Sequence, residues 1–117
     1  MYFLIVFVLN DVDQCSNILD AWELEGIRGI TILDSSGLGR VRRAATRDDL
    51  PLMPSLSDVL RSKETRHRTL FTVVKDQKTI DKVVDATQSV VGDLEHEDTG
   101  FLFVIPVSQA YGKGKVK

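Results

Sequence analysis

Four apolar stretches of the chain have the length of β-strands, at residues 2–9, 29–34, 67–75 and 100–107. The first and last stretches, YFLIVFVL and GFLFVIPV, are apolar at successive positions, so both faces of each strand are apolar. The second stretch combines β-branched and other aliphatic residues, which favours extended structure. Pro106 lies in the last stretch, and because proline cannot donate a ladder hydrogen bond, this strand is expected to lie at a sheet edge or to end near Pro106.

Two segments between these strands carry apolar residues at helical spacing. The stripes consist of Val12, Cys15, Ile18, Leu19 and Trp22 in the first segment, and of Ile80, Val83, Val84, Thr87 and Val91 in the second. Asn10 or Asp11 can cap the first helix, and Asp76 can cap the second. Gly26 and Gly92 follow the stripes, and glycine adopts the left-handed conformation that ends many helices. The pattern therefore predicts two amphipathic helices.

The predicted order βαββαβ is that of the ferredoxin-like α+β fold, an antiparallel sheet with two helices on one face. We expect one domain over residues 1–117, with a long loop over 35–66 between the second and third strands and a mobile tail over 112–117. Helices on one face leave the other face of the sheet open. Leaving the apolar side chains of that face in water would cost about 1.5–3 kcal/mol each. Another copy of the chain is expected to cover them.

Composition restricts the class of protein. A chain of 117 residues, 43% hydrophobic and with net charge −2, is typical of one globular domain and argues against nucleic-acid binding, which needs a basic surface. The single cysteine, Cys15, forms no intrachain disulfide, and no Cys/His cluster has zinc spacing. We expect a cytoplasmic protein without a metal. The apolar start has no basic region before it and is too short to span a bilayer.

Charge is unevenly distributed along the chain. Residues 40–68 have net charge +4, which leaves −6 for the remainder. A basic loop on an acidic body suits an anion or an acidic partner surface, with Arg42, Arg43 and Arg47 as candidate partner contacts. The simpler interpretation is a solvated loop without a ligand. The two histidines lie far apart and no catalytic triad or phosphate loop is present, so we do not expect an enzyme.

The strand over residues 29–34 runs into the sequence Ser-Ser-Gly37-Leu38-Gly39-Arg40. Glycine has no Cβ, so successive backbone N–H groups at this turn could approach an anion closely. The arginine could then pair with the charge, because its planar fork matches phosphate and carboxylate. We therefore expect a small anionic effector to bind at this turn.

The stretch GIRGITILDSSGLGR resembles the nitrogen regulatory protein PII family, in which a Gly-x-Thr strand precedes a Gly-x-Gly-Arg turn at the start of the T-loop. The coarse resemblance extends over nearly the whole chain. It implies a homotrimer with its sheets facing inward, adenine nucleotide binding in clefts between subunits, and signalling through the T-loop to a regulated protein or membrane transporter. It also adds Thr31 to the effector-binding residues Gly37, Leu38, Gly39 and Arg40.

Departures from the family pattern affect which of its properties are expected here. Val41 replaces the glutamine that serves magnesium and 2-oxoglutarate, and the T-loop tyrosine is missing. The loop after the second helix, GDLEHEDTG, has four acidic residues and no lysine. ATP is therefore expected to bind weakly or not at all, and the identity of the effector stays open. The alternatives are another ferredoxin-like module that binds small molecules, or an oligomeric ferredoxin-like enzyme.

Overall fold

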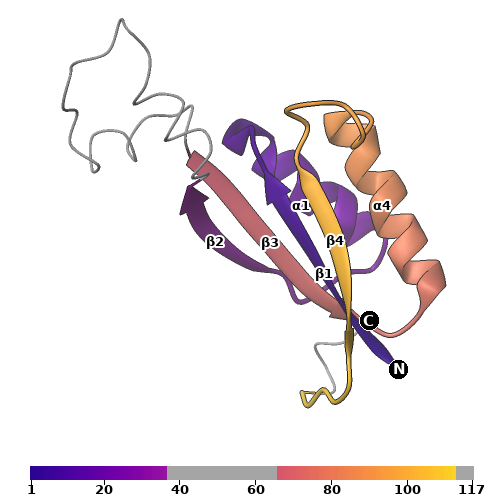
Figure 1. Ribbon diagram of the computed structural model, residues 1–117. Helices are drawn as coiled ribbons and strands as arrows, with labels where there is room; N and C mark the ends of the chain where they lie inside the picture. Colours follow the sequence, from indigo (N-terminus) through magenta and orange to yellow (C-terminus); the bar gives the residue numbers. More distant parts are fainter. Residues whose placement is uncertain (37–65, 113–117) are drawn as a thin grey trace, which may run out of the picture.

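The computed structural model describes residues 1–36 and 66–112 (Figure 1). The long loop expected over 35–66 lies outside the described residues except at its ends, and so does all but the first residue of the tail expected over 112–117.

The described chain forms a four-stranded antiparallel sheet with two α-helices on one face (Figure 1). The strands lie in the order β2-β3-β1-β4, so β2 and β4 are the edges. Both the βαββαβ order and the edge position of the strand that contains Pro106 are confirmed. The elements are β1 (Tyr2–Leu9), a 3₁₀ turn η1 (Val12–Gln14), α1 (Cys15–Leu24), β2 (Thr31–Ser36), β3 (Arg66–Val74), α4 (Gln77–Val91) and β4 (Phe101–Val107).

The predicted cap of the second helix is confirmed, whereas the predicted cap of the first helix, Asp11, serves the 3₁₀ turn η1, and α1 begins at Cys15 after Gln14, which makes no side-chain cap bond. The Asp11 carboxylate accepts a hydrogen bond from a backbone N–H at the start of η1, and Asp76 caps α4 by accepting from both the N–H and the hydroxyl of Thr79. Gly26 and Gly92 follow the helices with φ of +87° and +91°, a conformation that side chains disfavour. Local sequence therefore sets the start of α4 and the glycine that follows each helix.

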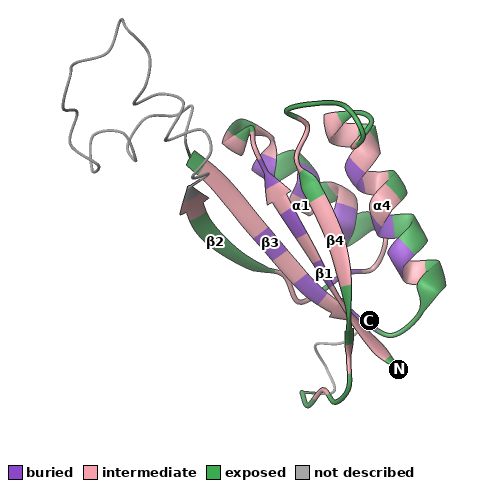
Figure 2. Ribbon diagram, in the orientation of Figure 1, coloured by how far each residue is buried: buried purple, intermediate pink, exposed green. Residues whose placement is uncertain are grey.

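The core lies between the sheet and the helices (Figure 2). Alternate β1 residues, Ile5, Phe7 and Leu9, are buried against the helices. Trp22 of α1 is fully buried, and its indole Nε1 donates to Thr87 Oγ1 of α4 over 2.9 Å. The Thr87 hydroxyl in turn donates to a backbone carbonyl of its own helix. This pair satisfies the polar groups that the helix contact buries.

β2 differs from its predicted bounds, because it begins at Thr31 and continues to Ser36 instead of running from 29 to 34. Serine often starts a turn, which is why the sequence pattern places the strand end earlier. Here the Ser35 and Thr69 hydroxyls share a hydrogen bond of 2.9 Å, and Ser35 pairs with His67 of β3. Pairing with β3 therefore extends the strand past its apolar part.

The sheet face opposite the helices is apolar, as the two-sided strands predict. Because directly paired residues share a face, the register places on it Leu4, Val6 and Val8 of β1, Phe71 and Val73 of β3, and Phe101, Phe103 and Ile105 of β4. Phe101 and Ile105 are exposed and the others half-buried, and no part of the described chain forms a second layer over them. This surface is called the open face below.

Candidate functional site

Only one of the five predicted effector residues belongs to the described part of the chain. Thr31 is described, and it is the exposed first residue of β2. Gly37, Leu38, Gly39 and Arg40 lie outside the described residues. The same is true of the three arginines assigned to partner contact, Arg42, Arg43 and Arg47. The structure therefore locates one member of the predicted site.

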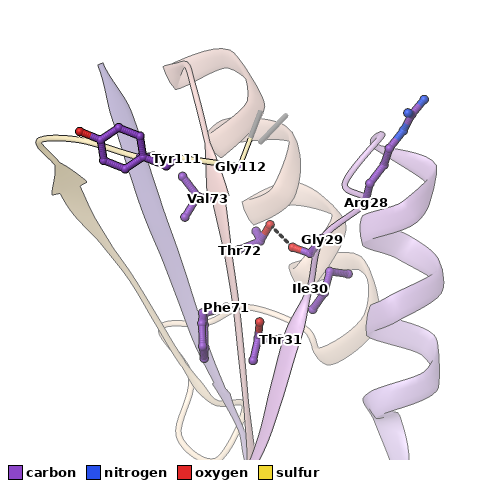
Figure 3. Close-up of a pocket in the computed structure, with 10 residues that line it drawn as sticks. Arg28, Gly29, Ile30, Thr31, Phe71, Thr72, Val73, Tyr111 and Gly112 are labelled. Atoms are coloured by element: carbon purple, nitrogen blue, oxygen red, sulfur yellow. Dashed lines mark hydrogen bonds between the residues drawn. The ribbon is translucent and has the colours of Figure 1, made fainter. Parts of the chain in front are cut away.

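Thr31 lines a cavity of about 500 Å³ at the start of β2 (Figure 3). Three segments that are distant in sequence meet there. They are the segment that leads into β2, the second half of β3, and the segment that follows β4. The lining residues are Arg28, Gly29, Ile30, Thr31, Phe71, Thr72, Val73, Ala110, Tyr111 and Gly112.

Hydrogen bonding and burial hold the strand side of this cavity in place. The Thr72 hydroxyl donates to the Gly29 carbonyl oxygen over 2.6 Å, and Thr72 is only 3% exposed (Figure 3). Ile27, two residues before Gly29, is buried in the core. Further along the two strands, Thr31 of β2 is paired with Phe71 of β3, and their side chains lie on the same face of the sheet. The cavity therefore has a fixed backbone wall with a hydroxyl and an aromatic ring at its edge.

Two residues at the rim were not singled out from the sequence. Arg28 is exposed, and its side chain extends outward from the loop before β2 (Figure 3). Tyr111 lies on the segment after β4 and is 89% exposed. The sequence signal for Arg28 was its position within GIRGIT, immediately before the glycine of the Gly-x-Thr strand. Tyr111 had no such signal, because the segment after β4 comes close to the start of β2 only in the folded chain.

The cavity and the predicted glycine turn lie at opposite ends of β2. Gly37 follows Ser36, the last residue of the strand, whereas Thr31 is the first. Because an extended strand rises about 3.4 Å per residue, Thr31 and Ser36 are separated by about 17 Å. A compact anion at Thr31 therefore does not extend to Ser36, and the residues of the predicted glycine turn lie outside the described part of the chain.

Polar side chains connect β2 and β3 near the end of β2. Asp34 and Arg68 face each other on paired strands, with Arg68 Nε 3.5 Å from Asp34 Oδ1. Both side chains are substantially exposed, so solvent screens their attraction. The Ser35–Thr69 hydrogen bond links β2 to β3 in this region, where β1 ends opposite Arg68 and only β2 and β3 continue.

A second, smaller cavity of about 160 Å³ lies at the same end of the sheet as the glycine turn. It is lined by Leu9, Asp11, Gln14, Val90, Val91, Asp98 and Thr99. The adjoining loop before β4 contains the four acidic residues of the DLEHED stretch, which lies over residues 93–98. Within residues 1–36 and 66–112, no three carboxylate, histidine or cysteine side chains are grouped to hold a metal ion.

Comparisons with known proteins agree with this architecture. The family model for nitrogen regulatory protein P-II matches residues 4–113. Among solved structures, the crystal structure of Arabidopsis thaliana PII bound to citrate superposes with a TM-score of 0.60 at 17% sequence identity, covering 92% of this chain and 75% of that one. At that identity the likeness shows the fold. No curated protein sequence matches the chain.

Proposed function

The chain belongs to the nitrogen regulatory protein P-II family, and on this premise we propose that it binds a small anionic effector at clefts between subunits and regulates a partner protein through the segment between β2 and β3. Proteins of this family are regulatory rather than catalytic. They are typically trimers that act on partner proteins. The finer assignments of effector, assembly and partner are our proposal for this chain.

The observation that carries the effector proposal is the cavity beside Thr31. It lies at the start of the strand that leads to Gly37–Arg40, and its wall is held by the Thr72–Gly29 hydrogen bond. Cavities of this size, with a few polar groups among apolar ones, suit small ligands. An adenine nucleotide is elongated enough to extend from this cavity towards the glycine turn. The acidic loop over residues 93–98 lies at the end of the sheet where β1 ends. Its negative charge disfavours binding of a triphosphate there.

The open face supports the proposal of a homotrimer. Its aliphatic and aromatic side chains form a continuous apolar surface over β1, β3 and β4. Phe101 is 64% and Ile105 45% exposed, and the Phe101 ring lies beside that of Phe103, with 5.4 Å between the ring centroids. Large apolar surfaces of this kind mark sites of association. Covering them with other copies would remove this surface from water and form the clefts that the proposal requires.

The location and the partner are also proposed. We expect the protein to act in the cytoplasm, because its one cysteine, Cys15, is a buried free thiol of the core. Over the described residues, no helix is both long and apolar enough to cross a membrane. Arg42, Arg43 and Arg47 would contact the partner, either a regulated protein or a membrane transporter with an acidic surface. No nucleic-acid partner is expected.

A thermal-shift screen of nucleotides, bicarbonate and carboxylates tests the effector proposal. A ligand should raise Tm, and AMP or a carboxylate should raise it more than ATP does. Calorimetry with the best ligand should then show weaker binding to Thr31→Val, which removes a hydroxyl at the cavity while keeping the side-chain shape. Ser89→Ala removes an exposed hydroxyl on α4 and serves as the control. Tight binding of magnesium-ATP would contradict the ranking, and equal affinity in Thr31→Val would remove Thr31 from the site.

A further inference from the structure

Arg28 is the one charged residue among the ten that line the larger cavity, and none of the ten is acidic. This composition is unusual for a chain whose sequence pI is about 5.6. Within residues 1–36 and 66–112, Arg28 has neither an ion-pair nor a hydrogen-bond partner for its guanidinium. An acid group that enters this cavity would therefore meet a positive charge without a competing carboxylate.

The backbone around Arg28 is fixed although its side chain is exposed. Ile27 before it is 1% exposed, and the carbonyl of Gly29 after it accepts the Thr72 hydroxyl over 2.6 Å. The side chain extends outward from the rim (Figure 3), and its long stem can change direction by rotation about its own torsion angles while the backbone stays in place. An anchored backbone with a flexible cationic side chain can close on a bound acid without moving the strand.

Acidic residues are distributed unevenly between the two ends of the sheet: none lines the cavity, whereas the other end, where Arg66 and Arg68 of β3 also lie, has four in one loop. The four acidic residues of 93–98 precede β4 and so lie at the end of the sheet where β1 ends and β2 leads to Gly37. The cavity lies at the other end, beside the segment that follows β4. An anion in the cavity is separated from these carboxylates by the length of β2, about 17 Å.

We propose that Arg28 binds the acid group of the effector and makes the cavity at the start of β2 selective for a compact carboxylate or phosphate. The proposal rests on the proposed function and moves the charge-recognising residue from Arg40 to Arg28. The planar guanidinium donates two parallel hydrogen bonds to either acid. Thr31, at the same cavity, supplies a hydroxyl that can donate to a further ligand oxygen.

Calorimetric titration of the full-length protein with citrate, with inorganic phosphate and with neutral adenosine tests this assignment. Citrate and phosphate separate the two acid chemistries, and adenosine reports contacts that do not depend on charge. Arg28→Ala should weaken binding of the preferred acid about ten- to hundredfold, the effect of losing a charge-assisted hydrogen bond. Arg28→Lys should recover part of the affinity. Lys82→Ala removes the same charge from the exposed side of α4 and should bind like the wild type.

The outcomes separate this inference from the proposed function. If Arg28→Ala binds the acid as tightly as the wild type while Arg40→Ala loses affinity, the acid group lies at the glycine turn. That result would overturn the role of Arg28 and leave the proposed function standing. If the wild type binds neither acid, adenosine nor any nucleotide of the screen, both proposals are wrong. Circular dichroism of each variant establishes that the change in binding occurs in a folded protein.

Discussion

Val6 and Phe7 are adjacent in β1 and face opposite sides of the sheet, so the same substitution at each separates assembly from folding. Phe7 is 0% exposed beneath the helices, whereas Val6 lies half-buried on the open face, paired with Phe71 and Phe103. An aspartate at Val6 would place a charge on the surface that the proposed trimer buries. An aspartate at Phe7 would place it in the core.

The magnitudes of the two changes differ. Truncation of a buried phenylalanine costs about 3–5 kcal/mol, and an unpaired charge in its place adds several more. Because domains of this kind are stable by about 5–15 kcal/mol, Phe7→Asp should unfold the chain. Val6 is only half-buried in the single chain. The Val6→Asp substitution should therefore lower the free energy of unfolding by less than the roughly 1.5–3 kcal/mol that a fully buried valine contributes. The Val6→Asp chain should fold and fail to assemble.

Light scattering and circular dichroism measure both consequences. The wild type should have about three chains per particle by the family relationship, Val6→Asp should be a folded species of lower mass, and Phe7→Asp should lose its helical signal. Val6→Thr keeps the β-branched shape, and Ser89→Asp adds the same charge on exposed α4, so both should remain assembled. A wild type that is monomeric at micromolar concentration, or a Val6→Asp variant of unchanged mass, would refute the assignment of the open face.

Three further changes test the interior and the helix ends. Thr87→Val leaves the fully buried Trp22 indole without its acceptor and should lower the free energy of unfolding by about 1–3 kcal/mol in urea titration; an unchanged value would show that the bond is dispensable. Gly100→Ala should destabilise more than Gly92→Ala, because a Cβ at Gly100 would lie 2.7 Å from a core phenylalanine ring and from a backbone carbonyl, whereas none lies within 4 Å at Gly92; comparable Tm losses would contradict this. Hydrogen bonds from Thr79 in the first turn of α4 lower the pKa of Asp76 in the folded protein. Its contribution to the free energy of unfolding should therefore be complete above the unfolded pKa of about 3.8 and lost as the pH falls through the lower folded pKa. Asp76→Asn should flatten this acid part of the curve of stability against pH, and an unchanged curve would exclude Asp76 as its source.

Prediction from sequence works where the determining interactions are local. The capping of α4 by Asp76 and its end at Gly92 depend on residues within one helical turn, and both were predicted. The end of β2 depends on a partner strand distant in sequence. Ser35 continues the strand because Thr69 offers it a hydroxyl, and nothing in the local pattern of serines indicates that partner.

The candidate site shows the same division. Thr31 was predicted from a local motif, and it lines the cavity. Its grouping with Gly37–Arg40 stays a prediction, because those four residues lie outside the described part of the chain. Tyr111 was missed because it reaches the cavity only when β4 has paired with β1.

The sequence by itself determined the order of helices and strands, the cap of α4, the glycine after each helix, the ferredoxin-like class and the apolar character of both faces of β1 and β4. These properties follow from side-chain periodicity and from capping, which act over a few residues. Only the tertiary structure decided which alternate residues of β1 are buried, and that the segments around Arg28, Phe71 and Tyr111 form one cavity. The physical reason is that strand register and the return of the C-terminal segment arise from pairing between distant residues, so the cavity exists only once the sheet has formed.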